Sequence, residues 1–349
     1  MGYKLNLVKQ YLMHLLSYEL NYPFSQPTEI NFQMTNRCPL RCKMCNIPDN
    51  KKDKEELTVG ELKDVVDEVV EWNENEKYVS FVGGEALVRK EDTLEMIDYC
   101  KEKGLHTTLV TSGVLMDEEL CQELIEIGLD RIAFSIDGNK AETHNEIRGE
   151  EVYGKAIKQL DKMLELRNGN PKVDVNTVIM KQNFEELPDI HEMVREKGVD
   201  EIFYQAVVPD NTYKNKADLY NSEVWIDKDE EEKLKEVVEE LKELKEKHGM
   251  INNSKRYLDS VPDYFVQKEE FEPGKCLAGY MGLNIDPYGD ISICGFGPNI
   301  NVKDGNIEEL WKSEEFRETR EKIKNCSRPC LMLCYRKASL TELVDKIRG

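Results

Sequence analysis

Hydrophobic and polar positions along residues 28–206 alternate between two periods. Short apolar runs with a two-residue period predict strands, and longer stretches with apolar residues three and four apart predict helices. The expected strands are 29–35, 78–82, 106–110, 131–136, 173–180 and 201–205. The expected helices are about 59–72, 91–103, 117–127, 140–146, 153–167 and 184–197. This order predicts an α/β fold with a parallel sheet and right-handed crossovers. A closed barrel needs eight strands, so we expect a partial (β/α)6 barrel of the TIM type.

The pattern changes on both sides of this region. Residues 3–20 carry a broad apolar stripe that predicts a helix packed across the main domain, with contact to a membrane surface or to a partner as the alternative. The Glu- and Lys-rich stretch 227–248 predicts a solvated bridging helix, and residues 285–293 predict a small hairpin with its turn at 288–290. A last helix is expected to begin near Ile307.

These changes divide the chain into four expected parts. They are an N-terminal helical extension (1–27), the partial barrel (28–206), a helical linker or insert (207–272) and a small C-terminal hairpin-plus-helix domain (273–349).

Composition narrows the function classes. The chain has 349 residues, of which 40% are hydrophobic and 34% are charged, and its formal net charge is −21. A nucleic-acid-binding protein usually has a basic face, so a nucleic-acid partner is disfavoured. The sequence contains neither a long apolar run nor the residue order of a signal peptide, and we therefore expect a cytoplasmic location.

The ten cysteines fall into two groups and two single positions. Cys38, Cys42 and Cys45 form a C-x3-C-x2-C loop directly after the first expected strand. Three thiolates are one fewer than a closed zinc or iron–sulfur site uses, so one metal position stays open for chemistry. The alternative is a structural zinc site that borrows a distant ligand. Cys100 and Cys121 fall singly in helical patterns and are expected to be buried core thiols.

This loop, in this place, resembles that of the radical S-adenosylmethionine (radical SAM) superfamily. The resemblance implies that Cys38, Cys42 and Cys45 hold a [4Fe–4S] cluster whose fourth iron binds S-adenosylmethionine. In that family the reduced cluster cleaves S-adenosylmethionine to a 5′-deoxyadenosyl radical, which abstracts hydrogen from a substrate. Met44 departs from the pattern, because the residue before the third cysteine is often aromatic.

The resemblance extends to residues at the expected strand ends and implies contacts with S-adenosylmethionine. Gly83-Gly84-Glu85 resembles the motif that contacts the methionine amino group, and Arg148 resembles the arginine that pairs with the methionine carboxylate. The other implied contacts are Ser112, Ser135, Asp137, Asn176 and Val178. Ser135 and Asn176 could equally serve as ordinary hydrogen-bonding residues at strand ends.

The second cysteine group resembles the auxiliary-cluster extensions called SPASM and twitch. Cys276, Gly289 and Cys294 match the C-x(9–15)-G-x4-C spacing, and Cys326, Cys330 and Cys334 follow. Five thiolates can complete one four-thiolate cluster, so the resemblance implies one auxiliary [4Fe–4S] cluster. The spacing leaves open which of the last three cysteines is spare, and a structural zinc is the alternative metal.

These features together predict a radical SAM enzyme that takes electrons from a donor such as ferredoxin or flavodoxin. The auxiliary cluster would accept an electron from the substrate or anchor it. Residues 1–27 are too short for a peptide-binding leader domain, which favours a small-molecule, sugar or lipid-like substrate over a peptide. A non-catalytic metal-binding scaffold is the alternative outside catalysis.

Overall fold

The computed structural model describes residues 2–50, 53–72, 77–208, 219–267, 275–294, 297, 300–326 and 330–332. Its strands form an eight-stranded sheet in the order β6-β5-β4-β3-β2-β1-β7-β8. Strands β1 to β6 pair in parallel with their neighbours in the chain, which confirms the six expected strand–helix units. These strands are β1 (Glu29–Gln33), β2 (Tyr78–Val82), β3 (His106–Thr111), β4 (Arg131–Ser135), β5 (Lys172–Ile179) and β6 (Glu201–Ala206).

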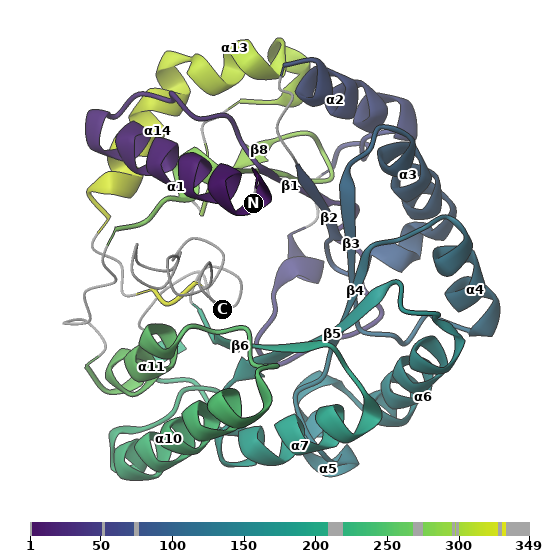
Figure 1. Ribbon diagram of the computed structural model, residues 1–349, viewed down its shortest axis with the longest axis vertical. Helices are drawn as coiled ribbons and strands as arrows, with labels where there is room; N and C mark the ends of the chain where they lie inside the picture. The colour runs from purple at the N-terminus through teal and green to yellow at the C-terminus, as the bar shows by residue number, and fades with distance from the viewer. Residues whose placement is uncertain are drawn as a thin grey trace.

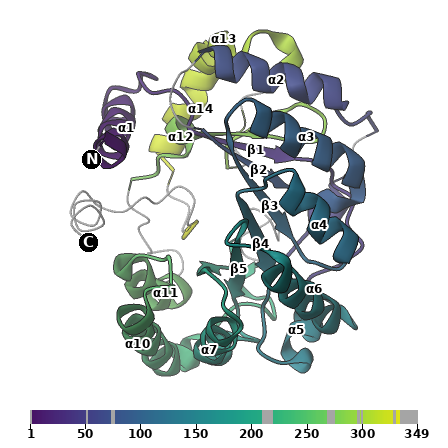
Figure 2. The same ribbon diagram turned by 45° about the vertical axis from the view of Figure 1, so that its right-hand side comes forward.

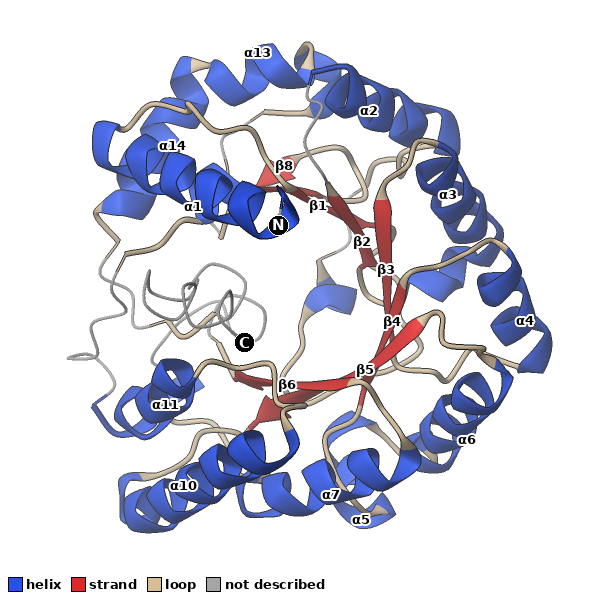
Figure 3. Ribbon diagram, viewed as in Figure 1, coloured by secondary structure: helices blue, strands red, loops and turns tan. Residues whose placement is uncertain are grey.

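Helices cover the convex outer side of the curved sheet (Figures 1 and 3). They are α2 (Val59–Trp72), α3 (Lys90–Glu102), α4 (Glu118–Glu126), α5 (Ala141–Arg148), α6 (Val152–Leu166) and α7 (Leu187–Lys197). Short 3-10 turns precede three of them, namely η1 (Ile47–Asp49), η2 (Ala86–Arg89) and η3 (Phe184–Glu186). The described sheet has β6 and β8 as its two edges, so the expected partial, open barrel is confirmed.

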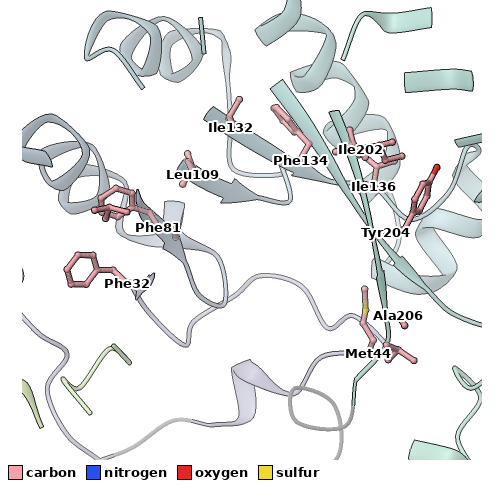
Figure 4. Close-up of a cluster of buried hydrophobic side chains, with 14 of the residues drawn as sticks. Phe32, Met44, Phe81, Leu109, Ile132, Phe134, Ile136, Ile202, Tyr204 and Ala206 are labelled. Atoms are coloured by element: carbon pink, nitrogen blue, oxygen red, sulfur yellow. The ribbon is translucent and has the colours of Figure 1, made fainter. Parts of the chain in front are cut away.

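Local sequence signals account for much of this order. Strands β1, β2, β3 and β6 alternate between buried and half-buried residues, as the two-residue period requires. Thr58 and Glu61 exchange hydrogen bonds in a capping box at the start of α2, and the Asp117 side chain accepts from the Leu120 amide at the start of α4. Figure 4 shows part of the resulting core, from Phe32 and Phe81 to Ile202 and Tyr204.

The C-terminal hairpin extends the main sheet. Strand β7 (Gly282–Ile285) pairs in parallel with β1, and β8 (Ile291–Ser292) pairs antiparallel with β7. The turn contains Gly289 at φ +87°, where a Cβ atom would lie 2.8 Å from the Asn301 side-chain oxygen. Glycine is therefore required by both the backbone conformation and the packing of this turn. The expected hairpin is confirmed, but its pairing with β1 was not foreseen.

The remaining described elements complete the fold behind and beside the hairpin. They are η4 (Lys228–Glu230), α10 (Glu231–His248), α11 (Lys255–Gln267), α12 (Ala278–Met281), η6 (Val302–Asp304), α13 (Ile307–Lys312) and α14 (Glu314–Lys324). Helix α13 confirms the helix expected near Ile307, and it packs on α2 and α14. Figure 2 shows α12, α13 and α14 beside the β1 end of the sheet and α10 and α11 beside the β6 end.

Helix α10 is packed rather than solvated along its length. Leu234, Val237, Val238 and Leu241 are buried where α10 meets α11 and α7. The prediction of a solvated bridging helix was therefore wrong for this face. The sequence shows this apolar stripe, and it is enough to anchor a charge-rich helix to its neighbours.

The outer edge of β6 is closed by the chain that follows α10. The Ile202 amide donates to the Met250 carbonyl, and the Tyr204 amide donates to the Asn253 side chain. The Asn253 side-chain amide returns a hydrogen bond to the Tyr204 carbonyl. These partners satisfy an edge that would otherwise expose unpaired backbone groups.

Helix α1 (Gly2–Leu20) packs on the C-terminal part of the chain rather than across the main strand–helix units. Its buried Tyr18 contacts Tyr280 of α12, with ring centroids 5.9 Å apart, and His14 and Ser17 are also buried. The side chains of Leu12, Leu16 and Leu20 are exposed on the opposite side. Among the described residues, no helix combines the length and apolar character needed to cross a membrane.

Candidate functional site

A cavity of about 310 Å³ lies at the carboxyl ends of the parallel strands. This is the edge at which barrel enzymes place their sites, and the volume falls in the range of ligand pockets. The cysteine loop, residues 38–45, forms one wall. The predicted site residues that line the cavity are Cys38, Cys42, Cys45, Gly83, Gly84, Glu85, Ser112, Ser135, Arg148 and Val178. The structure therefore brings together predicted residues from several segments that lie far apart in the chain.

Two contacts anchor the middle of the cysteine loop. The Lys43 amide donates to the Ile147 carbonyl at 2.9 Å. The Lys43 ammonium group pairs with Glu146 at 3.0 Å and with Glu223 at 2.9 Å. The loop is thus attached to the end of α5, the helix that also carries Arg148.

The three cysteines of the loop are half-buried and form no disulfide with any described residue. Burial raises the pKa of the Cys38 thiol to about 11 and raises the pKa of the Cys42 and Cys45 thiols. The Arg148 guanidinium opposes this rise in pKa at Cys42 and Cys45. A positive charge beside two thiols favours their thiolate forms, which are the forms that bind metal. The donor set and its surroundings therefore fit a thiolate-bound cluster.

Gly83 and Gly84 allow two loops to meet. The Gly84 amide donates to the Thr35 carbonyl at 2.8 Å, and the Glu85 amide donates to the Arg37 carbonyl at 3.0 Å. A Cβ atom at Gly83 would lie 2.6 Å from the Thr35 carbonyl oxygen, and one at Gly84 would lie 2.4 Å from that of Arg37. The glycines were expected to admit a ligand. In the structure, Gly83 and Gly84 pack against the backbone of Thr35 and Arg37, which leads into the cysteine loop. Both glycines also line the cavity.

Glu85 is held by the end of β3. Its buried carboxylate accepts hydrogen bonds from the Thr111 hydroxyl at 2.9 Å, the Ser112 amide at 2.9 Å and the Ser112 hydroxyl at 2.6 Å. The Leu87 amide donates to the same carboxylate at 3.5 Å. Glu85 also lines the cavity, where a carboxylate suits a cationic ligand. Ser112 therefore orients Glu85 as well as lining the cavity.

Arg148 lines the cavity and forms an ion pair with the buried Asp137 at 2.6 Å. Asp137 also accepts from the Val178 amide at 2.8 Å, and the Asp137 amide donates to His144 at 3.1 Å. The Asp137 carboxylate fixes the position of the Arg148 guanidinium. The positive charge of Arg148 therefore stays close to the Cys42 and Cys45 thiols and to the cavity. Burial lowers the pKa of His144 to about 4, so this histidine is neutral.

Two predicted contacts lie behind the cavity wall. Asp137 and Asn176 are not among the described residues that line the cavity. Asp137 acts on Arg148 and β5, and the Asn176 carbonyl accepts from the Ile136 amide at 3.0 Å. Their direct contact with S-adenosylmethionine stays a prediction.

Some cavity residues were missed by sequence reasoning. Gln205 to Val208, at the end of β6, and Met332, near the C-terminus, line the cavity opposite the glycines. The position of Gln205 at the end of a strand was a usable signal. Met332 gave none, because it reaches the cavity only through the folded path of the C-terminal segment.

The described cysteines of the second group are Cys276, Cys294, Cys326 and Cys330, and each is half-buried and forms no disulfide with a described residue. Cys334 lies outside the described residues. Cys276 precedes α12, and Cys294 follows β8 at φ +53°. A hairpin thus separates these two cysteines, as the spacing predicted.

Side chains draw two of these cysteine segments together. The ammonium groups of Lys275 and Lys324 lie 5.8 Å and 5.1 Å from the centroid of the Tyr18 ring. Each lysine lies within two residues of a cysteine, Cys276 or Cys326. Helix α1 therefore supports the second cysteine group, and cation–π contacts contribute to this support.

Arg320 of α14 links the same two segments from inside. Its fully buried guanidinium donates to the carbonyls of Gly279 and Trp311, both at 2.8 Å. The rings of Tyr280, Trp311 and Phe316 lie within 5.5 Å of it. Burial lowers the pKa of Arg320 to about 9. The arginine thus joins α12, which follows Cys276, to α14, which precedes Cys326.

Comparison with known proteins bears on this arrangement. The family model described as the radical SAM superfamily matches residues 32–194, and the SPASM model, an iron–sulfur cluster-binding domain, matches residues 276–335. A PqqA peptide cyclase from Rhodopseudomonas palustris is 30% identical over 303 residues, which cover 84% of this chain and 75% of the relative. The chain belongs to the radical SAM superfamily. It is an enzyme of the SPASM-containing branch, and the expected fold and family are confirmed.

Further similarity spans most of this radical SAM chain. An AdoMet-dependent heme synthase from Methanosarcina barkeri is 28% identical over 306 residues, which cover 84% of this chain and 85% of the relative. The crystal structure of Streptococcus suis SuiB bound to S-adenosylmethionine has a TM-score of 0.66 at 17% identity, covering 87% of this chain and 70% of that one. This structural likeness shows a common fold.

The family implies a [4Fe–4S] cluster, S-adenosylmethionine and auxiliary iron–sulfur binding. The cavity fits the first two, because it combines three thiols with a buried arginine and a buried carboxylate. The described cysteines of the second group offer the thiol chemistry that an iron–sulfur cluster requires.

Proposed function

We propose that this radical SAM enzyme modifies a peptide by abstracting hydrogen from it and oxidising or cross-linking the product. The observation that carries this proposal is the 30% identity to a peptide cyclase over three quarters of that relative. The sequence-based preference for a small-molecule, sugar or lipid-like substrate depended on the expected absence of a leader domain. The similarity supports the peptide alternative instead.

Within this proposal, Cys38, Cys42 and Cys45 hold the first cluster. Glu85 binds the amino group of S-adenosylmethionine, and Arg148 binds its carboxylate. When bound, these cofactors supply reductive cleavage of the sulfonium and a route to hydrogen abstraction. Ser112 orients Glu85, Asp137 orients Arg148, and Ser135 and Val178 line the remaining wall. The chain's own task is thus to position two cofactors and to exclude water around them.

The second cysteine group would hold the auxiliary cluster through four of Cys276, Cys294, Cys326, Cys330 and Cys334. A cluster with four protein thiolates has no open iron, which favours electron acceptance over substrate anchoring. Asn176 would contact S-adenosylmethionine from the side of β5.

A second candidate substrate is a tetrapyrrole. The similarity to an AdoMet-dependent heme synthase covers 85% of that relative at 28% identity. The same cofactor machinery would then remove hydrogen from a porphyrin side chain. The two candidates differ in the size and chemistry of the molecule that donates hydrogen.

Deuterium transfer distinguishes these candidates even while the exact substrate is unidentified. The reduced holoenzyme is incubated with S-adenosylmethionine and one of three perdeuterated samples. These are the peptide fraction of cells, the small-molecule fraction of cells, and iron coproporphyrin III. We expect deuterated 5′-deoxyadenosine, detected by mass spectrometry, with the peptide fraction. Label that appears only with the small molecules or only with the porphyrin would overturn the peptide proposal.

The electron donor, the location and any surface contact stay predictions. Reduction by ferredoxin or flavodoxin is tested by replacing dithionite with each reduced protein. A cytoplasmic location is tested by cell fractionation. Membrane contact through residues 3–20 is supported by the exposed Leu12, Leu16 and Leu20, and equal liposome partitioning of the full chain and a chain lacking residues 1–22 would argue against it.

A further inference from the structure

The edge strand of the barrel and the C-terminal cysteine segment meet at one hydroxyl group. The Tyr257 hydroxyl of α11 accepts a hydrogen bond from the Ala206 amide at 2.9 Å. It donates to the Leu331 carbonyl at 3.2 Å. A phenol has one proton to donate, so the contact with Leu331 uses the donor capacity of this side chain. Tyr257 therefore links the Ala206 amide, the last amide of β6, to Leu331, which follows Tyr257 by 74 residues.

A second barrel side chain reaches the same carbonyl. The Gln205 side-chain amide donates to the Leu331 carbonyl at 2.8 Å. A carbonyl oxygen has two lone pairs, and the two donors from β6 and α11 occupy both. Gln205 also lines the cavity, whereas Tyr257 is buried behind it. The pair forms a clamp on one backbone group.

The clamped residue lies between two parts of the machinery. Leu331 is fully buried, and the preceding Cys330 is half-buried. The following Met332 lines the cavity, as does Met44 of the cysteine loop. Figure 4 shows Met44 close to Ala206, the residue whose amide Tyr257 holds. One short segment thus carries a predicted cluster ligand at one end and a piece of cavity wall at the other.

We propose that Gln205 and Tyr257 are positioning residues that seat the Cys330–Met332 segment against the cavity. The role of Cys330 as a ligand rests on the proposed function, whereas the clamp itself does not. Supporting residues commonly hold functional groups to within about 0.5 Å, and a displacement of about 1 Å can cost 100-fold in rate. The clamp therefore fixes the position of Cys330 and Met332 relative to the end of β6.

Thiol accessibility in the cluster-free protein tests the clamp directly. Cys330 is alkylated with iodoacetamide, and its rate is read by peptide mass spectrometry. We expect Tyr257→Phe to raise the rate about 5-fold, and the Tyr257→Phe, Gln205→Met double variant about 30-fold, because Leu331 loses one and then both of its hydrogen bonds to these side chains. The buried Cys121 serves as the internal check and should stay unreactive.

Tyr264→Phe is the matched control. Tyr264 is buried on the same helix, and its hydroxyl donates to the Val207 carbonyl at 2.7 Å. The control therefore removes a similar hydrogen bond without touching Leu331. We expect the Cys330 rate of this variant to equal that of the wild type.

Electron paramagnetic resonance distinguishes a specific positioning role of the clamp from a general loss of stability. In a chain with Cys38, Cys42 and Cys45 replaced by Ala, the reduced auxiliary cluster is observed alone by electron paramagnetic resonance. Tyr257→Phe should change this spectrum, and Tyr264→Phe should not.

The clamp is overturned if Tyr257→Phe and Gln205→Met each leave the Cys330 rate at the level of Tyr264→Phe. If Tyr257→Phe exposes Cys121, the Gln205→Met variant decides alone. Because alkylation uses cluster-free protein, its result is independent of whether the wild type accepts a peptide.

Discussion

The two cysteine regions of this molecule are positioned by different means. The cysteine loop follows β1, and its partners Glu85, Ser112 and Ser135 come from the ends of three successive parallel strands. The second group depends on side-chain links such as Tyr18 and Arg320 between segments far apart in the chain. Sheet register thus places the first region, whereas the second adds a few side-chain contacts to the β7–β8 hairpin. The first region should tolerate surface changes, and the second should fail when one contact is lost.

The largest expected effect comes from removing the first region's thiols. Replacing Cys38, Cys42 and Cys45 by Ala should abolish S-adenosylmethionine cleavage and the change in cluster spectrum on adding S-adenosylmethionine. Iron analysis should show the loss of one cluster. The core thiol variant Cys121→Ala is the control and should keep both signals. A triple variant with full iron content would contradict the assignment.

Changes in the second region should separate cleavage from product formation. Replacing Cys276 and Cys294 by Ala should spare much of the S-adenosylmethionine cleavage and block formation of the modified substrate, because we propose that cleavage takes place at Cys38, Cys42 and Cys45. Chromatography of both products measures the ratio. If the double variant makes product normally, the electron-acceptor role is wrong.

Glu85→Gln tests how the first region binds its ligand. The amide keeps the shape of the side chain but turns a donor toward Thr111 or Ser112, where the carboxylate accepts hydrogen bonds. We expect S-adenosylmethionine to bind about 10- to 100-fold more weakly, or about 1.4–2.7 kcal/mol. Equilibrium dialysis measures this, with Glu95→Gln in an exposed ion pair with Lys63 as the matched control. Unchanged binding would exclude Glu85 from the contact.

Arg320→Leu tests the side-chain links of the second region. It leaves the Gly279 and Trp311 carbonyls without their donor, which should cost about 2–4 kcal/mol of stability. Urea unfolding of the cluster-free protein measures this loss, and iron analysis should show loss of the auxiliary cluster. Arg317→Leu, which removes exposed ion pairs on the same helix, should have little effect on either. Retained auxiliary iron in Arg320→Leu would contradict the account.

The smallest effect concerns neither region. His191 and His248 lie 57 residues apart in the chain, yet their ring nitrogens are 3.0 Å apart between α7 and α10. Burial lowers the pKa of His191 to about 4. A histidine in the unfolded chain has a pKa of about 6.5. Between pH 6.5 and pH 4 the unfolded chain therefore binds a proton at His191 that the folded protein does not bind. The contribution of His191 to stability is therefore present above pH 6.5 and falls by about 2 kcal/mol between pH 7 and pH 5.

Urea unfolding at the two pH values measures this loss, and His191→Gln should reduce it while leaving both cysteine regions intact. The rest of the slope should persist, because burial also lowers the pKa of His144 to about 4. A slope unchanged in His191→Gln would show that this histidine is not the titrating group.

The same comparison explains what the sequence could predict. Strand ends and cysteine spacing are local signals, so the six strand–helix units and the gathering of Cys38, Glu85 and Arg148 could be foreseen. The pairing of β7 with β1 could not, since it joins residues about 250 positions apart with no local mark. The apolar face of the charge-rich α10 is visible in the sequence, but the helices that cover it, α11 and α7, could not be foreseen.

Side-chain roles were harder to predict than side-chain locations. Asp137 is predicted to touch the cofactor, and the structure shows a further role that the sequence did not indicate, the ion pair with Arg148. The contacts of Tyr257 and Gln205 with Leu331 depend on where the C-terminal segment passes, which only the folded chain defines.

The most direct test of the central claim is a single cleavage assay. Anaerobically purified wild-type protein is reduced with dithionite and mixed with S-adenosylmethionine, and 5′-deoxyadenosine is measured by liquid chromatography and mass spectrometry. The account predicts 5′-deoxyadenosine from the wild type and none from the variant lacking Cys38, Cys42 and Cys45. No 5′-deoxyadenosine from a wild type that carries its full iron content would contradict it.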